Sequence, residues 1–559
     1  MDKPYASLAK AVAESPDGGT VVVLSDLTAD RCARFYNKSI TIRSAEGKRY
    51  TVTRGDDFAS QNDPARSWYN PAMIEVAGTV NPDAVDAPPK AYLRIENLIL
   101  DDGGRHSGKK LGYAVIDDGS GTADRSKNLE FVQDAIIASY NGTGVITLGD
   151  GAILRNFGGM SAVRVTGGGT AATGSTLIME KGSCIEDTLT AEEFGERAKP
   201  LQRGNAAVVL QGATVVMEEG SVIRNRVLSA KGIQGSAGSS IQMGGEITGL
   251  TSGGNAINTG GDVQCVIAAT GNIHHNTVWY GTIYMQGGTL DIYGKINDNY
   301  STDRAGGVCL AHNIGYTVAT LHAGGEICGN YAKQTGGGVM VSYGSFTMEE
   351  GSRIDNNAAH DEGGGVYVRN GGTFIMNGGS VSGNKTEKFG GGIAYKATAW
   401  GGGAKPLAHA NVVLHGGTVS GNRMSCTPAG NSPAELLGGV ENELAVDAAK
   451  GSCSYRNLSI DRTLSYDVYF VTDEKTLSRT DEFSSGNATK EADSALRQSA
   501  AGWADVLQTM WYNVPGDTAS FRLSLPKNAD PALPFYVMTL ETDEDGTPTS
   551  ADPTVSAVR

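Results

Sequence analysis

The sequence predicts an all-β fold, a right-handed parallel β-helix (solenoid), on three observations. A phrase repeats between about Gly287 and Ile393, in which a glycine pair opens a short strand, an Ile/Val-x-x-Asn turn follows and a GGGV-type step closes the unit. The anchors of four copies lie 31, 27 and 27 residues apart, at Ile296, Ile327, Ile354 and Val381. The phrase has no helical periodicity, and a unit this short buries a core only by stacking on its neighbours.

Two further regularities characterise each coil. Apolar side chains alternate along the strands and are expected to point inward, at Val339, Val341, Val366, Val368, Phe374 and Met376. One asparagine recurs in each copy, at Asn299, Asn330, Asn357 and Asn384. Stacked at one corner, these amides are expected to form a ladder that satisfies the backbone at each turn. A β-sandwich would instead need tight hairpin turns such as Asn-Gly, and these do not separate the runs.

Residues 1–38 are expected to form an N-terminal helical cap. Apolar residues recur at helical spacing at Leu8, Ala11 and Val12, and the first strand follows in DGGTVVVLSD. A cap is physically required, because an open solenoid end exposes both the core and an unpaired strand edge.

Residues 39–440 are expected to form the β-helix. Before the regular copies, less regular coils are visible in SITIRS, YLRIENLIL, GVITLGDGAILRNF, SAVRVTGG, STLIMEKGSCIEDT, AVVLQGATVVMEEGSVIRNR and SIQMGGEITG. Long polar insertions are expected at Arg54–Pro89, Asp101–Asn128, Thr188–Asn205 and Lys396–Ala410. Such insertions project from the flank of a solenoid, where loops often build binding walls.

Residues 441–559 are expected to form a C-terminal cap or a small appended α+β domain, because the repeat stops there. This segment contains the strand-like pieces YDVYFV, SFRLSL and PFYVMTL, and a helix is predicted around Ala492–Met510.

Composition narrows the partners and the location of the protein. The 559 residues carry a formal net charge of −15, which disfavours nucleic acid and anionic membrane surfaces. No stretch approaches the length of a membrane span, so no membrane insertion is expected. The start, MDKPYASLAKAV, lacks the features of a signal peptide. We expect a secreted or cell-surface protein whose export signal and anchor lie outside this sequence.

Neither a metal site nor a cofactor is predicted. The 7 cysteines are widely spread and show no Cys/His spacing typical of a metal site. Cys309 and Cys328 lie in adjacent coils and could pair, but two buried thiols are the favoured interpretation. The carboxylates of LILDDGG and VIDDGSG could hold structural calcium; neither matches a complete loop pattern, so solvated turns are favoured.

Because equivalent positions of successive coils stack about 4.8 Å apart, aligning the copies gives columns of side chains. The position before each ladder asparagine holds Asp298, Gly329, Asn356 and Gly383. The position four after it holds Asp303, Gln334, Asp361 and Lys388. Asp298 and Asp303 thus flank one corner, and Asp361 is expected about 9.6 Å from Asp303 along the stack. Glycoside hydrolysis needs two carboxylates, about 5–5.5 Å apart in retaining and about 6.5–9.5 Å apart in inverting enzymes.

Aromatic and polar residues gather around this acidic corner. Trp279 is the candidate sugar platform, because sugars stack their apolar faces on aromatic rings. The candidate substrate-binding residues are Trp279, His274, His275, Tyr280, Tyr300, Arg304, Gln334, His360 and Asp361. The simpler alternative is that exposed corners collect Asp and Asn for turn formation alone.

The runs GVITLGDGAILRNFGGMSAVRVTGG, LIMEKGSCIEDT and VVMEEGSVIRNR, with the later Trp-bearing coil, resemble the β-helical lacto-N-biosidases of glycoside hydrolase family 136. The resemblance spans about Ser39–Ser420. It implies a retaining enzyme that releases a disaccharide such as lacto-N-biose from milk-type or mucin glycans. The family's two catalytic aspartates would best match Asp298 and Asp303, although the family spacing is slightly longer. It also implies a helical folding partner, which this chain does not contain.

Two other functions are compatible with the repeat. Coils of this type also occur in adhesins, which bind host glycans or proteins without catalysis. Another carbohydrate-active β-helix, such as a lyase or a different glycosidase, is the second alternative. A lyase would need a row of basic residues to neutralise a uronate, and the acidic columns lack one. The concentration of Trp, His and Asp between residues 274 and 361 favours hydrolysis by a glycosidase over uniform adhesin columns.

Overall fold

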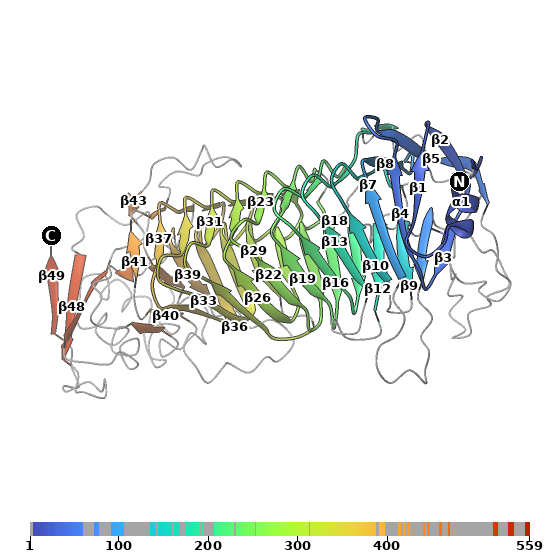
Figure 1. The fold of residues 1–559 in the computed structure, drawn as a ribbon. Coiled ribbons are helices and arrows are strands. Elements are labelled where there is room, and N and C mark those ends of the chain that lie inside the picture. Colours follow the sequence, from blue (N-terminus) through green and yellow to red (C-terminus); the bar gives the residue numbers. More distant parts are fainter. Residues whose placement is uncertain are drawn as a thin grey trace, which may run out of the picture. The chain divides into compact units, whose positions relative to one another are not determined.

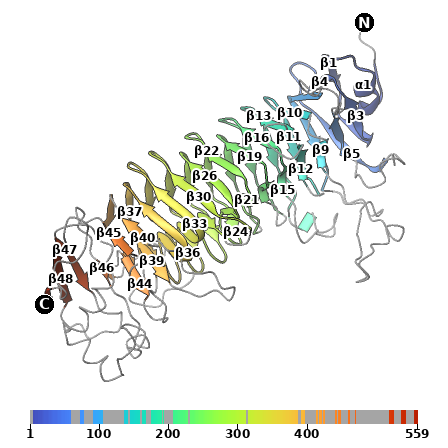
Figure 2. The ribbon, with the colours of Figure 1, turned by 90° about the horizontal axis from the view of Figure 1, so that it is seen from below.

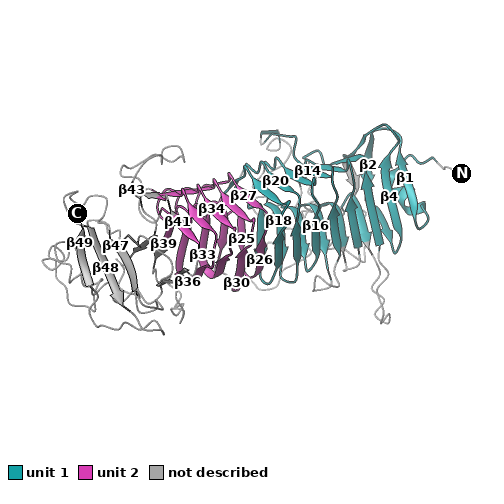
Figure 3. Ribbon diagram, turned by 60° about the vertical axis from the view of Figure 1, so that its left-hand side comes forward, with its two compact units in different colours: residues 1–278 teal, residues 279–559 magenta. Residues whose placement is uncertain are grey.

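The computed structural model shows a nearly all-β chain in which long parallel sheets follow a single named helix, as the predicted fold class requires. It describes residues 4–59, 72–77, 91–104, 135–140, 144–158, 161–167, 175–190, 192–193, 206–227, 231–251, 253–311, 314–386, 391–396, 412–414, 417–420, 422–424, 440–441, 444–447, 458–460, 468–469, 518–523, 535–541 and 554–558. The chain divides into two compact units, residues 1–278 and 279–559 (Figure 3). The domain borders expected near residues 38 and 440 stay predictions.

The first unit begins with helix α1 (Leu8–Glu14), whose Leu8, Ala11 and Val12 are buried, as predicted. The helix packs against the first strands of the unit (Figure 1). One parallel sheet of this unit contains β1 (Gly19–Val23), β3 (Ala33–Tyr36), β4 (Ser39–Ser44), β6 (Ile74–Ala77), β7 (Ala91–Glu96), β9 (Ala135–Tyr140), β10 (Gly144–Leu148), β12 (Ser161–Thr166), β13 (Thr176–Met179), β15 (Ala206–Gln211), β16 (Thr214–Met217), β18 (Lys231–Ser236), β19 (Ser240–Met243), β21 (Ile257–Gly260) and β22 (Gln264–Ile267).

A second parallel sheet of the first unit contains β2 (Leu27–Arg31), β5 (Tyr50–Ala59), β8 (Leu98–Asp101), β11 (Ile153–Arg155), β14 (Cys184–Glu186), β17 (Val222–Arg224), β20 (Glu246–Thr248) and β23 (Asn272–His274); β24 (Thr277–Val278) ends the unit. The chain order is regular, because from β3 onward two strands join the first sheet before one joins the second. Equivalent strands pair in parallel, so that Ile146, Leu177 and Val215 lie in one fully buried column. The strands predicted in this region are therefore confirmed.

One predicted insertion is wrong in part. The interval Arg54–Pro89 was expected to be a polar loop, but β5 runs on to Ala59 and β6 lies within the interval. Strand β6 pairs with β3 and β9, and its Ile74 and Val76 are fully buried. Its short apolar run IEVA is hidden in the sequence by long polar flanks, which is why periodicity alone misses it.

In the second unit each repeat also adds strands to a third sheet. The first sheet contains β25 (Ile283–Met285), β26 (Gly288–Ile292), β29 (Val308–Leu310), β30 (Thr317–Leu321), β33 (Val339–Met348), β36 (Val366–Met376), β39 (Ile393–Lys396), β40 (Val412–Leu414), β44 (Leu444–Asp447), β45 (Leu458–Ile460) and β46 (Val468–Tyr469). The second contains β27 (Lys295–Asn297), β31 (Glu326–Cys328), β34 (Arg353–Asp355), β37 (Ser380–Ser382) and β41 (Thr418–Ser420). The third contains β28 (Tyr300–Ser301), β32 (Tyr331–Ala332), β35 (Ala358–Ala359), β38 (Lys385–Thr386), β42 (Arg423–Met424) and β43 (Val440–Glu441).

The register of the second unit matches the aligned copies. Ile296, Ile327, Ile354 and Val381 pair in successive strands, with the predicted periods of 31, 27 and 27 residues. Successive strands of the first and second sheets lie side by side and parallel within the unit (Figure 2). The residues predicted to point inward, such as Val339 and Phe374, are fully buried.

The predicted asparagine ladder is confirmed. The side-chain oxygen of Asn357 accepts both the backbone N–H and the side-chain amide of Asn330, at 2.9 and 3.0 Å. Its own amide donates to the carbonyl of Ile327 at 2.8 Å and to Asn384 at 3.0 Å. The same pattern links Asn299 to Asn330 and continues from Asn384 to Asn422, which lies beyond the four aligned copies.

A small antiparallel sheet, β47 (Thr518–Leu523), β48 (Phe535–Glu541) and β49 (Thr554–Val558), lies near the end of the sequence. Strands β46, β47 and β48 overlap the predicted pieces YDVYFV, SFRLSL and PFYVMTL. The helix predicted around Ala492–Met510 lies outside the described residues.

Candidate functional site

The acidic turn of the second unit follows strand β28 and leads into β29. The hydroxyl of Ser301 accepts the backbone N–H of Asp303 at 3.4 Å, and its one hydrogen is shared between the carbonyls of Arg304 and Trp279, at 2.8 and 3.1 Å. The backbone N–H of Gly281 also donates to the Arg304 carbonyl, at 2.9 Å. The chain segment that carries Trp279 is therefore fixed against the turn that carries Asp303 and Arg304.

Backbone hydrogen bonds align this turn with the equivalent turns of the next two repeats. The N–H of Gln334 donates to the Asp303 carbonyl, and the N–H of Asp361 donates to the Gln334 carbonyl, each at 2.7 Å. Because neighbouring strands lie about 4.8 Å apart, the backbones at Asp303 and Asp361 are about 9.6 Å apart. The predicted column is thus present, except that its fourth member, Lys388, lies outside the described residues.

Asp303 combines partial burial with an incomplete set of hydrogen-bond partners. Its Oδ1 is buried and has no hydrogen-bond partner among the described residues. The nearest cation is Arg304, whose Nε lies 3.8 Å from that oxygen and instead donates to Oε1 of Gln334 at 2.9 Å. Burial raises the pKa of the Asp303 carboxyl group, and the charge of Arg304 only partly opposes the rise. A carboxyl group in this setting is suited to hold a proton.

His360 and Asp361 form a pair one strand beyond Gln334. The Nδ1 atom of His360 lies 2.9 Å from Oδ1 of Asp361, and both side chains are partly exposed. A carboxylate held by an imidazole in this way keeps a defined orientation and can accept a proton from water.

The aromatic residues of the site have different exposures. Trp279 is 64% exposed, and its ring centroid lies 6.1 Å from that of Tyr280. Tyr280 is partly buried, and burial raises the pKa of its phenol. Tyr300 stacks on Tyr331 in the next repeat with a centroid distance of 5.3 Å. Of these rings, Trp279 has the most free surface on which a sugar could stack.

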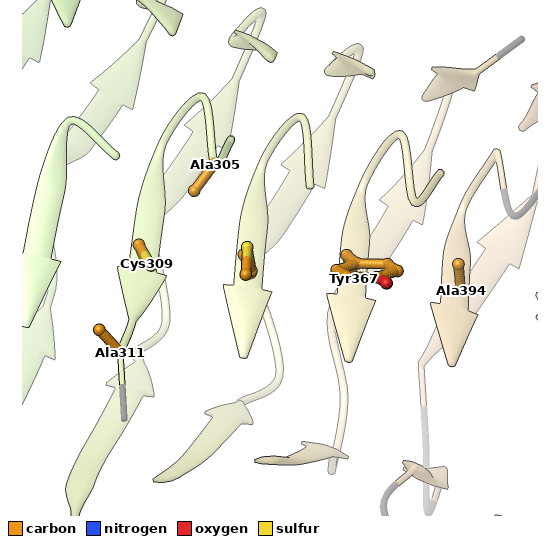
Figure 4. Packing of buried hydrophobic residues seen from close by; sticks show 6 residues of the cluster. Ala305, Cys309, Ala311, Tyr367 and Ala394 are labelled. Atoms are coloured by element: carbon orange, nitrogen blue, oxygen red, sulfur yellow. The ribbon is translucent and has the colours of Figure 1, made fainter. Parts of the chain in front are cut away.

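An apolar cluster beneath the turn was missed in the sequence. Tyr280 and Tyr284 pack against a cluster of buried residues, whose members are drawn in Figure 4. The cluster consists of Ala305, Cys309, Ala311, Met340, Tyr367 and Ala394. The signal was available, because Cys309, Met340, Tyr367 and Ala394 each follow the Val or Ile of a GGV or GGI step and pair in register. Glu362 was also missed in the sequence; it is buried and pairs in register with Thr335 of the preceding repeat.

Asp298 lies at the opposite end of β28 from Asp303 and has a conformational role. Its φ of 54° is left-handed, as is that of Asn356 at the equivalent position, where Gly329 and Gly383 also have positive φ. The Asp298 carboxylate accepts the side-chain amide of Asn297 at 3.0 Å and lies over Gly329. Asp and Asn are the non-glycine residues that best tolerate this conformation, so the simpler interpretation as a turn residue accounts for Asp298.

His274 and His275 belong to the first unit. His274 Nε2 lies 2.7 Å from Oε1 of Glu246, and its Nδ1 lies 2.6 Å from Nδ1 of His275. His275 has a φ of 52°, at the turn position that Asp298 occupies in the second unit. These contacts explain both residues within their own unit.

The interpretation of LILDDGG as a solvated turn is wrong. Asp101 and Asp102 are 8% and 2% exposed and pair with Arg155 and Arg54. Opposite charges from neighbouring repeats therefore neutralise them, and the equivalent pair in later repeats is Glu186 with Arg224. The VIDDGSG segment lies outside the described residues. Within the described ranges, no group of three or more His, Cys, Asp and Glu side chains could hold a metal ion.

Two other sequence expectations concern cysteines and membranes. Cys309 is buried, Cys328 is partly buried, and both are free thiols, as favoured. No helix in the described part of the chain has the length and apolar character to cross a membrane.

Comparison of the chain with models of protein families, with curated proteins and with solved structures finds no match.

Proposed function

We propose that the repeats form a right-handed parallel β-helix. The support is the constant order in which successive strands join the sheets, together with the parallel pairing of equivalent strands. A parallel strand must be reached by a crossover, and such crossovers are right-handed in nearly all proteins. On this fold, the aligned turns after β28, β32 and β35 lie along one flank.

We further propose that the protein is a secreted or cell-surface glycoside hydrolase that uses this flank. The single observation that carries the proposal is Asp303, a partly buried carboxyl group with a raised pKa, in one column with Asp361 and tied through Ser301 to exposed Trp279. One protonated and one ionised carboxyl group beside an aromatic platform are the parts that glycoside hydrolysis needs. The resemblance to family 136 lacto-N-biosidases makes milk-type and mucin glycans the first substrates to test.

In the proposed reaction, Asp303 gives its proton to the glycosidic oxygen as the bond to the anomeric carbon breaks. A water molecule attacks that carbon, and Asp361, oriented by His360, accepts the proton of the water. Carboxyl groups that keep about the 9.6 Å spacing of their backbones have room for the water between them, which is the arrangement of inverting enzymes. The family resemblance instead favours retention, with Asp298 as nucleophile. The anomeric form of the first product therefore shows whether Asp361 or Asp298 is the second carboxylate beside Asp303.

The test is incubation of the full chain with lacto-N-tetraose and with mucin glycans, followed by mass analysis of released sugars and NMR of the first anomer. We expect a released disaccharide, a loss of about 100-fold or more in Asp303→Asn, and inversion with a similar loss in Asp361→Asn. If the product keeps the anomeric configuration of the substrate and activity is lost only in Asp298→Asn and Asp303→Asn, the second carboxylate is Asp298 and not Asp361. Binding of the glycans without release, unchanged by Asp303→Asn, would identify the non-catalytic adhesin alternative.

A further inference from the structure

Of the Gln334 amide and the Asp303 carboxylate, the Arg304 guanidinium hydrogen-bonds only the amide; it also interacts with the phenol of Tyr280. Its Nε donates to Gln334 Oε1 at 2.9 Å but lies 3.8 Å from Asp303 Oδ1, too far for a hydrogen bond. Asp303 Oδ1 is nevertheless buried and has no hydrogen-bond partner in the described part of the chain. The neutral amide therefore takes the donor that the adjacent carboxylate lacks.

The position of Gln334 is fixed by the fold. Its backbone N–H donates to the Asp303 carbonyl, and its own carbonyl accepts the N–H of Asp361. The Gln334 backbone consequently lies one strand away from the turn, and from there its amide oxygen accepts the hydrogen bond of Arg304 Nε. We propose that Gln334 is a positioning residue: its amide oxygen holds the Arg304 guanidinium away from the Asp303 carboxyl group and leaves that group free to carry a proton.

The other titratable groups around the turn do not supply an alternative cause. Tyr280 hydrogen-bonds Arg304, and Cys309 interacts electrostatically with Arg304 and Asp303; burial raises the pKa of each, so both are neutral near pH 7. Arg369 interacts with Cys309, Tyr280 and Tyr367, and Glu362 interacts with Tyr367, whereas the one charge among the described residues that acts on the Asp303 carboxyl group is that of Arg304. His360 and Asp361 are paired with each other one strand beyond Gln334. Arg304 is therefore the cation whose placement decides the charge of Asp303.

The inference makes opposite predictions for two substitutions of one residue. In Gln334→Met the acceptor is lost at similar volume, so Arg304 turns to Asp303, and the pKa of Asp303 falls by about 1–3 pH units. In Gln334→Glu an acceptor remains in place, so the pKa of Asp303 stays at or above its value in the unmodified chain. A merely structural role of Gln334 would not lower the pKa of Asp303 in Gln334→Met while leaving it unlowered in Gln334→Glu.

The measurement is a carbon-13 NMR titration of the full chain with labelled aspartate carboxyl groups, in which Asp303→Asn identifies the signal. Arg304→Met provides the matched background, because Gln334→Met should leave the Asp303 titration unchanged once the guanidinium is absent. An unshifted Asp303 titration in Gln334→Met with Arg304 present, or an equal shift in both backgrounds, would overturn the inference.

The effect of Gln334 on catalysis rests on the proposed function, and it is measured separately from the NMR titration. If Asp303 is the proton donor, the basic limb of the kcat/KM profile moves to lower pH in Gln334→Met, and the rate on that limb falls about tenfold for each pH unit that the limb moves. A shifted titration in a chain that releases no sugar supports the positioning role and defeats the hydrolase. Activity with an unshifted titration defeats the positioning role and leaves the hydrolase standing.

Discussion

At the residue scale, the glycines of the GGGV step are required by the close approach of two backbone segments. A Cβ atom on Gly337 would lie 2.3 Å from the carbonyl oxygen of Gly364 and 2.4 Å from that of Ala358. Both obstacles are backbone atoms, which side-chain rotation cannot relieve. Gly324 makes a useful comparison, because its φ of 84° is also left-handed but nothing lies within 4 Å of an added Cβ.

We predict that Gly337→Ala lowers the free energy of unfolding by several kcal/mol, whereas Gly324→Ala costs only about 1 kcal/mol, the usual penalty of a left-handed alanine. Urea unfolding of the two variants, followed by circular dichroism, measures the difference. Equal losses in the two variants would show that the contact across the GGGV step is not tight.

A buried ion pair in the first unit gives a second prediction at this scale. Arg226 and Asp187 are hydrogen-bonded with both side chains fully buried, and the guanidinium lies over the ring of Phe157. Burial lowers the pKa of Arg226 to about 10, so the residue stays charged at neutral pH.

We expect Arg226→Met to lower the free energy of unfolding by about 3–5 kcal/mol, because it leaves Asp187 buried without its cation. The double variant with Asp187→Leu should recover most of that loss in the same unfolding measurement; a double variant as unstable as the single one would contradict this account.

At the element scale, the asparagine ladder links each turn to the next through two kinds of hydrogen bond. Asn357 both donates and accepts within the ladder, whereas its neighbour Asn356 supplies only a left-handed turn that Gly329 and Gly383 supply in adjacent repeats. We predict that Asn357→Asp costs about 2–4 kcal/mol, since the carboxylate faces the Ile327 carbonyl and the Asn384 oxygen without a donor. Asn356→Gly should be nearly neutral. Thermal unfolding at neutral pH compares them, and a neutral Asn357→Asp would mean that the ladder adds little to stability.

A second connection between repeats depends on pH. His322 stacks on Tyr293 and hydrogen-bonds Asp291 and Glu349 through its two ring nitrogens, each at 2.9 Å. Burial disfavours the imidazolium, but the two carboxylates outweigh burial and raise the pKa of His322. A raised pKa in the folded state stabilises the protein below the unfolded value of about 6.5, and this contribution is lost as pH rises through the folded value.

The pH prediction compares the unmodified chain with His322→Phe, which keeps the stacked ring and loses the charge. The stability advantage of the unmodified chain should be largest near about pH 5.5 and should shrink by about pH 8.5. Unfolding in urea at both pH values gives the comparison. An advantage that grows with pH would have the wrong sign for a raised imidazole pKa.

The strands and the ladder could be predicted where one phrase recurs at nearly constant length, because register then follows from counting. The same counting placed Asp303, Gln334 and Asp361 in one column. It could not pair Asp101 with Arg155 or Glu186 with Arg224, because insertions of unequal length separate those repeats and hide their register. The cluster around Tyr367 was missed for another reason: alternation identifies one buried face, while β29 and the start of β36, at Val366, Tyr367 and Val368, are buried on both faces.

At the scale of the whole molecule, the net charge of −15 gives a test of the proposed substrate class. A strongly acidic protein repels polyanions over distances set by the screening length, about 14 Å at 0.05 M salt and about 4 Å at 0.5 M. Stacking on Trp279 and hydrogen bonds to neutral hydroxyl groups act only at contact and depend little on salt. Neutral and anionic glycans should therefore respond differently to ionic strength.

We predict that kcat/KM, or affinity if cleavage is blocked by Asp303→Asn, is nearly independent of salt for neutral glycans. For their sialylated counterparts it should be lower at about 0.05 M salt and should rise toward the neutral value at about 0.5 M, as screening removes the repulsion. Trp279→Ala should weaken both classes by about tenfold at either salt concentration, because it removes only the stacking contact. Tighter binding of the anionic glycans at low salt would contradict the prediction. Local cations such as Arg304 and Arg369 would then outweigh the negative potential of the whole molecule, and an anionic glycan would be the preferred substrate.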